Sequence, residues 1–122
     1  MFVNYDYSNF PEVKVTFTDI IKDESDFILF TQQWEKLYDD KKKFTFIFDV
    51  GDMGFVNPYW CYRIADFIGK MKEKPVHYLE RSTIINVNTV IKYLLKIVFS
   101  IQSPISPVTI IYLDGTSSVI NP

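Results

Sequence analysis

The sequence predicts one α/β domain built on a mixed, largely parallel β-sheet of four to five strands. Two observations predict it: short apolar segments alternate with helical patterns, and no linker or low-complexity run interrupts them. Strands that alternate with helices imply right-handed crossovers and parallel pairing. The chain has 122 residues, the length of a single domain, so we assign residues 1–122 to one domain.

The first two strands are expected to form a hairpin. Residues 2–7 are strand-like, and residues 13–18 alternate between apolar and polar side chains. Residues 8–11 between them carry Ser, Asn and Pro, which favour a turn. The predicted order is therefore a β-hairpin followed by αβαβαβ.

The first helix is predicted to begin at Ser25, a residue type that caps helix N-termini. Phe27, Phe30 and Trp34 recur at spacings of three and four, which gives this helix one apolar stripe. Residues 44–50 then form the strongest strand pattern. Because this segment is apolar at nearly every position, we expect a central strand covered by helices on both faces.

The second helix is predicted to begin with Asn57 as N-cap and Pro58 at the first helical position. Residues 82–87 form the next buried strand, and Asn88 or Thr89 caps the third helix.

The third helix has an unusually wide apolar arc that includes Val90, Leu94 and Ile97. One interpretation is a helix pressed between the sheet and a neighbour. The other is a face exposed to a partner helix, a second copy of the chain or a lipid. Residues 108–113 form the last predicted strand, and a short polar tail follows.

Composition excludes several classes of function. The net charge of −2 creates no field that attracts nucleic acid. A single cysteine, Cys61, allows no internal disulfide and no cysteine-based metal site, and His77 is the one histidine. The glycines do not form a phosphate-binding loop, so no cofactor is predicted. Aromatic residues make up 17% of the chain and predict a Phe-rich core.

No basic region followed by an apolar run opens the chain, so no signal peptide is predicted. The most apolar stretch, residues 84–101, is interrupted by asparagines and lysines and does not fit a transmembrane segment. Cytoplasmic localisation is the default expectation.

Asp49 and Asp52 follow the central strand at the edge where open α/β sheets bind ligands. Two acids there could hold Mg²⁺ beside a phosphate. The interpretation that we prefer makes Asp52 a turn residue and lets Asp49 accept from backbone amides. The sequence therefore predicts no catalytic residue, no metal site and no enzymatic activity.

The ordered pattern resembles a STAS domain, the fold of bacterial anti-sigma-factor antagonists. Residues 13–18, the first helix and residues 44–49 follow that order. Residues 49–59 look like the strand–loop–helix signature of the family, in which an aspartate-ended strand leads to a helix start. The resemblance implies a regulatory module that binds another protein or a second copy of itself as a homodimer.

One departure concerns the phosphorylation switch of the family. Members that switch carry Ser or Thr where Pro58 or Tyr59 stands, and Asn57 replaces their acid. The resemblance therefore implies an interaction surface at this helix start without the kinase-controlled hydroxyl. The predicted contact residues are Asn57, Pro58, Tyr59, Tyr62 and Arg63.

A second resemblance overlaps the first. Residues 77–87 are similar to the Tyr-Pro-Glu-Arg…Asn stretch of CRAL-TRIO lipid-binding domains, with Leu79 in place of the proline. It implies an alternative function, the binding of a lipid or another hydrophobic ligand. The residues expected to line such a cavity are Val90, Leu94 and Ile97.

Overall fold

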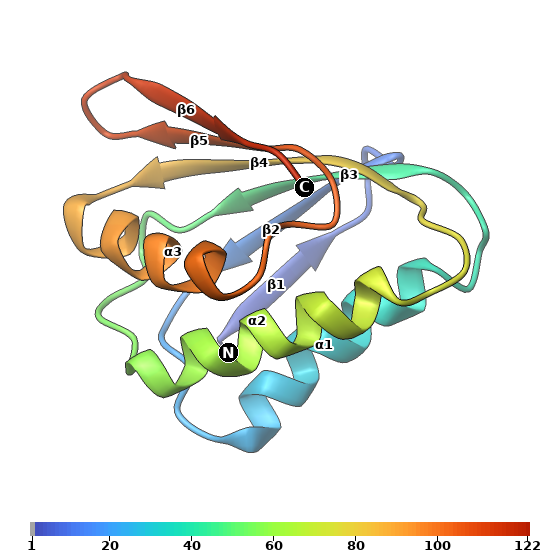
Figure 1. The fold of residues 1–122 in the computed structure, drawn as a ribbon, viewed down its shortest axis with the longest axis horizontal. Helices are drawn as coiled ribbons and strands as arrows, with labels where there is room; N and C mark the ends of the chain where they lie inside the picture. The colour runs from blue at the N-terminus through green and yellow to red at the C-terminus, as the bar shows by residue number, and fades with distance from the viewer. Residues whose placement is uncertain (1) are drawn as a thin grey trace.

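The computed structural model describes residues 2–122, which form a six-stranded mixed sheet and three helices (Figure 1). Their bounds in chain order are β1 (Val3–Asp6), β2 (Glu12–Phe17), α1 (Glu24–Leu37), β3 (Phe44–Asp49), α2 (Pro58–Lys72), β4 (Leu79–Val87), α3 (Thr89–Ile101), β5 (Val108–Tyr112) and β6 (Ser117–Ile120).

The strands lie in the sheet in the same order as in the chain. β1 and β2 are antiparallel, the next three pairs are parallel, and β5 and β6 are antiparallel. The α/β class and the opening hairpin are thus confirmed. The predicted number of four to five strands was wrong, because the polar tail folds back as β6. Backbone pairing such as Thr109 with Val119 makes this strand, and that pairing does not depend on an apolar pattern.

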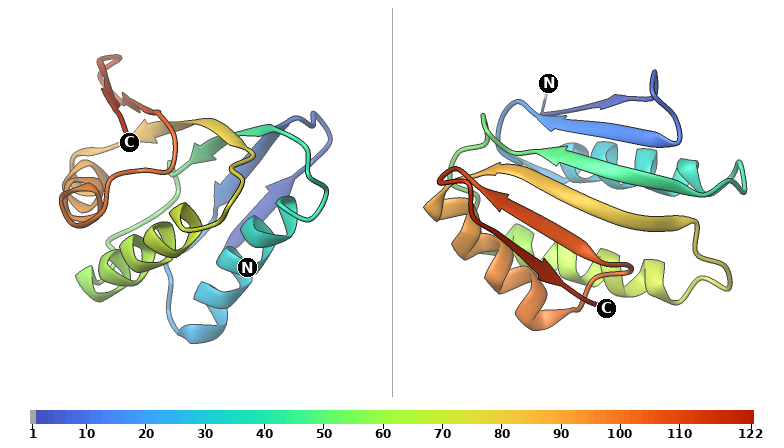
Figure 2. Two further views of the ribbon diagram at one scale, coloured as in Figure 1. Left: turned by 45° about the vertical axis from the view of Figure 1, so that its right-hand side comes forward. Right: turned by 90° about the horizontal axis from the view of Figure 1, so that it is seen from above.

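All three helices lie on one face of the sheet (Figure 2), so the expectation of helices on both faces of residues 44–50 was wrong. Each parallel strand is added on the same side of the previous one, so every right-handed crossover places its helix on the same face. Phe44, Phe46 and Phe48 are buried against the helices. Thr45 and Ile47 point to the other face and are half-buried. Over residues 2–122, no helix lies on that face.

The core between sheet and helices is rich in aromatic side chains, as predicted. The ring of Trp34 lies 4.9 Å from that of Phe46 and 5.2 Å from that of Phe67, measured between centroids. The Tyr5 hydroxyl donates to the Phe30 carbonyl at 2.7 Å, and burial raises the pKa of this phenol. These contacts hold the β1–β2 hairpin and α1 to β3.

Side-chain caps fix the helix starts. Asn57 and Asn88 cap α2 and α3 as expected, the latter accepting from the Ile91 N–H at 2.9 Å. The cap of α1 is Asp23 and not Ser25, since the Asp23 carboxylate accepts both the Asp26 N–H and the Ser25 hydroxyl. The helix therefore begins two residues earlier than its serine indicates.

The apolar stretch over residues 84–101 divides between the end of β4 and α3. Over residues 2–122, none of the helices combines the length and the apolar character needed to cross a membrane.

Candidate functional site

The start of α2 is held in a fixed geometry. The Asn57 side chain accepts the Tyr59 N–H at 3.0 Å, and Pro58 occupies the first turn with the backbone angle that a helix needs. The Asn57 carbonyl accepts the Trp60 N–H at 2.9 Å. Asn57, Pro58 and Tyr59 are all exposed, so these residues present a rigid surface to the outside.

The loop that leads from β3 to α2, residues 50–57, is anchored through Asp49. Its carboxylate accepts the Gly51 N–H and the Asn86 side-chain amide, each at 3.0 Å. Asn86 sits in a β-bulge of β4 with a φ of 61°. Burial by itself would raise the pKa of Asp49, but these two hydrogen bonds and the charge of Lys14 hold it below its ordinary value.

The two acids singled out in the sequence have different surroundings. One carboxylate oxygen of Asp49 accepts both loop contacts, and Asp52 is exposed in the turn that follows. Within residues 2–122, His, Cys, Asp and Glu side chains do not gather in groups of three or more that would hold a metal ion. The arrangement of Asp49 thus matches the preferred interpretation, in which its carboxylate accepts from the backbone.

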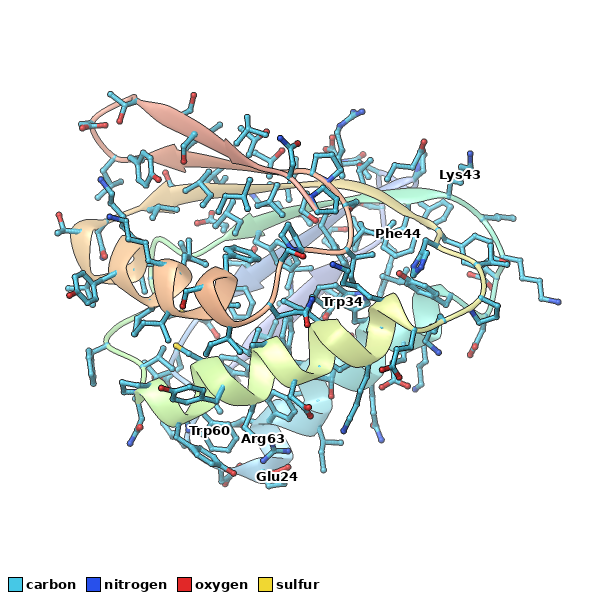
Figure 3. The ribbon with its side chains drawn as sticks, in the orientation of Figure 1. Glu24, Trp34, Lys43, Phe44, Trp60 and Arg63 are labelled. Atoms are coloured by element: carbon cyan, nitrogen blue, oxygen red, sulfur yellow. The ribbon has the colours of Figure 1, made fainter. Side chains whose placement is uncertain are left out.

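Arg63 is the centre of a cluster that joins α1 to α2. Its guanidinium forms a two-pronged ion pair with Glu24 and donates to the Tyr59 hydroxyl at 3.1 Å. It also lies over the ring of Phe27, 4.6 Å from the centroid. Figure 3 shows Arg63, Glu24 and Trp60 together below the sheet. Arg63 therefore holds the surface in shape and is not a free cation.

Three large aromatic side chains stand out from this surface. The exposed fractions are 64% for Phe55, 53% for Tyr59 and 58% for Tyr62. They come from one continuous stretch, the loop after β3 and the first turns of α2. We call residues 55–63 the aromatic surface. Exposed aromatic side chains on a rigid support are the usual anchors of protein–protein interfaces.

No family model, curated protein or solved structure matches this chain.

The five residues predicted from the sequence all lie on the aromatic surface, at the beginning of α2. Sequence reasoning missed Phe55, the most exposed of the three aromatics, and Glu24, the partner of Arg63. The position of Phe55 in the loop between Gly54 and Asn57 did not reveal its exposure, since Val56 in the same loop is buried in the core. Nothing in the sequence pairs Glu24 with Arg63.

An excess of acidic side chains surrounds the aromatic surface. A Cβ atom on Gly54 would lie 3.6 Å from the Ile20 side chain, so the loop before α1 and the loop before α2 are neighbours. Residues 18–28 and 49–63 carry six acids and two bases: Asp19, Asp23, Glu24, Asp26, Asp49 and Asp52 against Lys22 and Arg63. Both bases are already paired with acids of the same group.

The residues predicted to line a ligand cavity are separated by the structure. Leu94 lines an internal apolar cavity, whereas Val90 is 46% exposed and Ile97 is half-buried outside the cavity wall. Cys61 also lines this cavity; burial raises the pKa of its thiol, which disfavours the reactive thiolate. His77 is exposed in the loop between α2 and β4.

Proposed function

We propose that this protein is a non-enzymatic regulatory module that binds another protein through the aromatic surface. The observation that carries the proposal is the exposure of Phe55, Tyr59 and Tyr62 on a scaffold fixed by the Asn57 cap and the Arg63–Glu24 pair. A rigid aromatic patch loses little conformational entropy on binding, so its contact area contributes efficiently to affinity.

The acidic surroundings indicate the kind of partner. Two copies of the chain that met through this surface would bring their acid excess together, and like charges across an interface are unfavourable. A partner with an apolar centre and a basic rim would complement it instead. We therefore propose a different protein with a basic contact face, and self-association is the competing outcome.

The architecture supports a STAS-like module. β3, the loop anchored by Asp49 and the Pro58-started helix follow the strand–loop–helix order on which the resemblance rests. Because Pro58 and Tyr59 stand where switching members carry Ser or Thr, we propose binding that is not controlled by phosphorylation at this position.

The alternative is a small CRAL-TRIO-like protein that binds a lipid or another hydrophobic ligand, and for a long-chain lipid it is less well supported. The internal cavity has a volume of about 140 Å³. Sites that enclose drug-sized ligands have volumes of roughly 300 Å³ or more, and a long acyl chain needs comparable room.

Site-directed photo-cross-linking in cells tests the proposal. A photoreactive phenylalanine analogue is placed at Phe55 or Tyr62, and as a matched control at Val119, which is 59% exposed on β6. We expect one basic partner to be captured from positions 55 and 62 and not from 119. Equal capture from all three positions, or capture of a homodimer alone, would contradict the proposal.

A further inference from the structure

A cavity of about 140 Å³ lies between the sheet and the helices. Its wall combines inward side chains of the strands, such as Phe48 and Ile84, with those of α2 and α3, such as Ile68 and Leu94. The wall is almost entirely apolar. The half-buried side chains Leu95 and Phe99 belong to it too, so the cavity reaches toward the surface along α3.

The size of this cavity defines the ligands that fit. A cavity of about 150 Å³ with an apolar wall stays dry and binds a single aromatic ring. The space here therefore suits a molecule with one six-membered ring or a short alkyl chain.

Two residues of the wall carry a polar group without a hydrogen-bond partner within residues 2–122, the indole N–H of Trp34 and the hydroxyl of Ser106. Ser106, in the loop between α3 and β5, is 7% exposed, and its hydroxyl forms no hydrogen bond with any group in residues 2–122. A buried hydroxyl without a partner costs about 1–3 kcal/mol, so such groups in native proteins call for an explanation. A lone water molecule is a poor partner, because it needs two to four polar neighbours and this wall is apolar.

We propose that the cavity binds a small molecule with an apolar body of about one ring and a single hydroxyl or carbonyl group that hydrogen-bonds to Ser106. Burial of the apolar body against the wall stabilises the complex, and the polar group of the ligand forms a hydrogen bond with the Ser106 hydroxyl. Val56 and Cys61 of residues 55–63 line the cavity, but the exposed side chains Phe55, Tyr59 and Tyr62 do not, so either site can fail without the other.

Trp34 provides the readout, because it lines the cavity and Trp60 does not. In a Trp60→Phe background, cyclohexanol and cyclohexane are titrated into the protein while the Trp34 emission is recorded. We expect cyclohexanol to shift that emission and to raise the melting temperature, with a dissociation constant in roughly the millimolar range or tighter for so few atoms. In the reciprocal Trp34→Phe background, the Trp60 emission should not move.

Ser106→Ala separates hydrogen bonding from simple filling of the cavity. It removes the hydroxyl and keeps the apolar wall, so we expect the affinity for cyclohexanol to fall about tenfold while that for cyclohexane stays the same. A Val98→Phe substitution, which fills the space, should abolish binding of both. If that variant does not fold, the Ser106→Ala comparison still decides. The absence of any Trp34 response, or equal cyclohexanol affinity in Ser106→Ala and the parent, would overturn the proposal.

Discussion

Arg63 on α2 and Glu24 at the start of α1 form an ion pair across 39 positions of the chain. The pair lies beside the stacked rings of Phe27 and Trp60, whose centroids are 5.8 Å apart. It therefore links two helix starts that follow different strands, and it fixes the aromatic surface relative to the loop before α1.

The first prediction concerns the pH dependence of this pair. The hydrogen bond from Arg63, followed by its charge, lowers the pKa of Glu24. A carboxyl group with a lowered folded-state pKa stabilises the protein above its unfolded pKa of about 4.3, and this contribution disappears as the pH falls through the folded value. We expect Glu24→Gln to be less stable than the wild type at neutral pH, and this difference to be smaller at about pH 3, because the contribution of the pair is lost as the pH falls through the lowered pKa of Glu24. Urea unfolding at both pH values measures the difference in the free energy of unfolding between Glu24→Gln and the wild type.

Glu80→Gln is the matched control for this prediction, since Glu80 is an exposed acid on β4. It should leave stability unchanged at both pH values. A difference for Glu24→Gln that is undiminished in acid would show that the pair is not its cause.

The second prediction follows from the one-sided packing of helices on the sheet. Phe46 is 1% exposed and faces the helices, whereas its neighbour Ile47 faces away and is half-buried. Phe46→Ala should lower the free energy of unfolding by about 3–5 kcal/mol, and Ile47→Ala by less than half as much. Denaturant titrations compare the two. Equal losses would indicate that both faces of β3 are covered.

The third prediction compares two helix caps. Asn57 and Asn88 each accept a backbone N–H at the start of their helix. Changing either to Ala should lower the free energy of unfolding by about 1 kcal/mol. Only Asn57→Ala should also weaken binding of the cross-linked partner, because only this cap supports the aromatic surface. A similar loss of binding in Asn88→Ala would mean that the effect comes from stability alone.

The fourth prediction concerns two glycines of one loop. A Cβ on Gly51 would lie 3.2 Å from the Asp49 carboxylate and 3.3 Å from the Asn86 side chain, which is tighter than ordinary contact. Gly51→Ala should therefore lower the free energy of unfolding by about 1 kcal/mol. Gly54→Ala meets only the Ile20 side chain at 3.6 Å and should be neutral or stabilising by up to about 1 kcal/mol. Thermal unfolding compares the melting temperatures of Gly51→Ala and Gly54→Ala. A lower melting temperature for Gly54→Ala than for Gly51→Ala would contradict the loop geometry.

Local signals in the sequence predicted much of the fold. The Asn57-Pro58 cap and the Phe27, Phe30 and Trp34 stripe depend on near neighbours, and both appear in the structure. The side on which helices pack depends on strand order, which residues 44–50 do not encode. β6 depends on pairing with β5, so its polar residues gave no sign of it.

The candidate site also combines local features that the sequence predicts with long-range contacts that it does not. Its rigid start was predictable because capping and proline act within a few residues. The Arg63–Glu24 pair and the Asp49–Asn86 hydrogen bond bring together residues 39 and 37 positions apart, so only the folded chain shows them. The unpartnered hydroxyl of Ser106 likewise appears only when the packing around it is known.

The most direct test of the binding proposal is the affinity of the cross-linked partner for purified variants, measured by titration calorimetry. Tyr59→Ala and Tyr62→Ala should each weaken binding at least about tenfold, equivalent to about 1.4 kcal/mol. Val119→Ser should bind like the wild type, and added salt should weaken the complex because its rim is charged. Unchanged affinity in both tyrosine variants would contradict the assignment of the aromatic surface as the binding site.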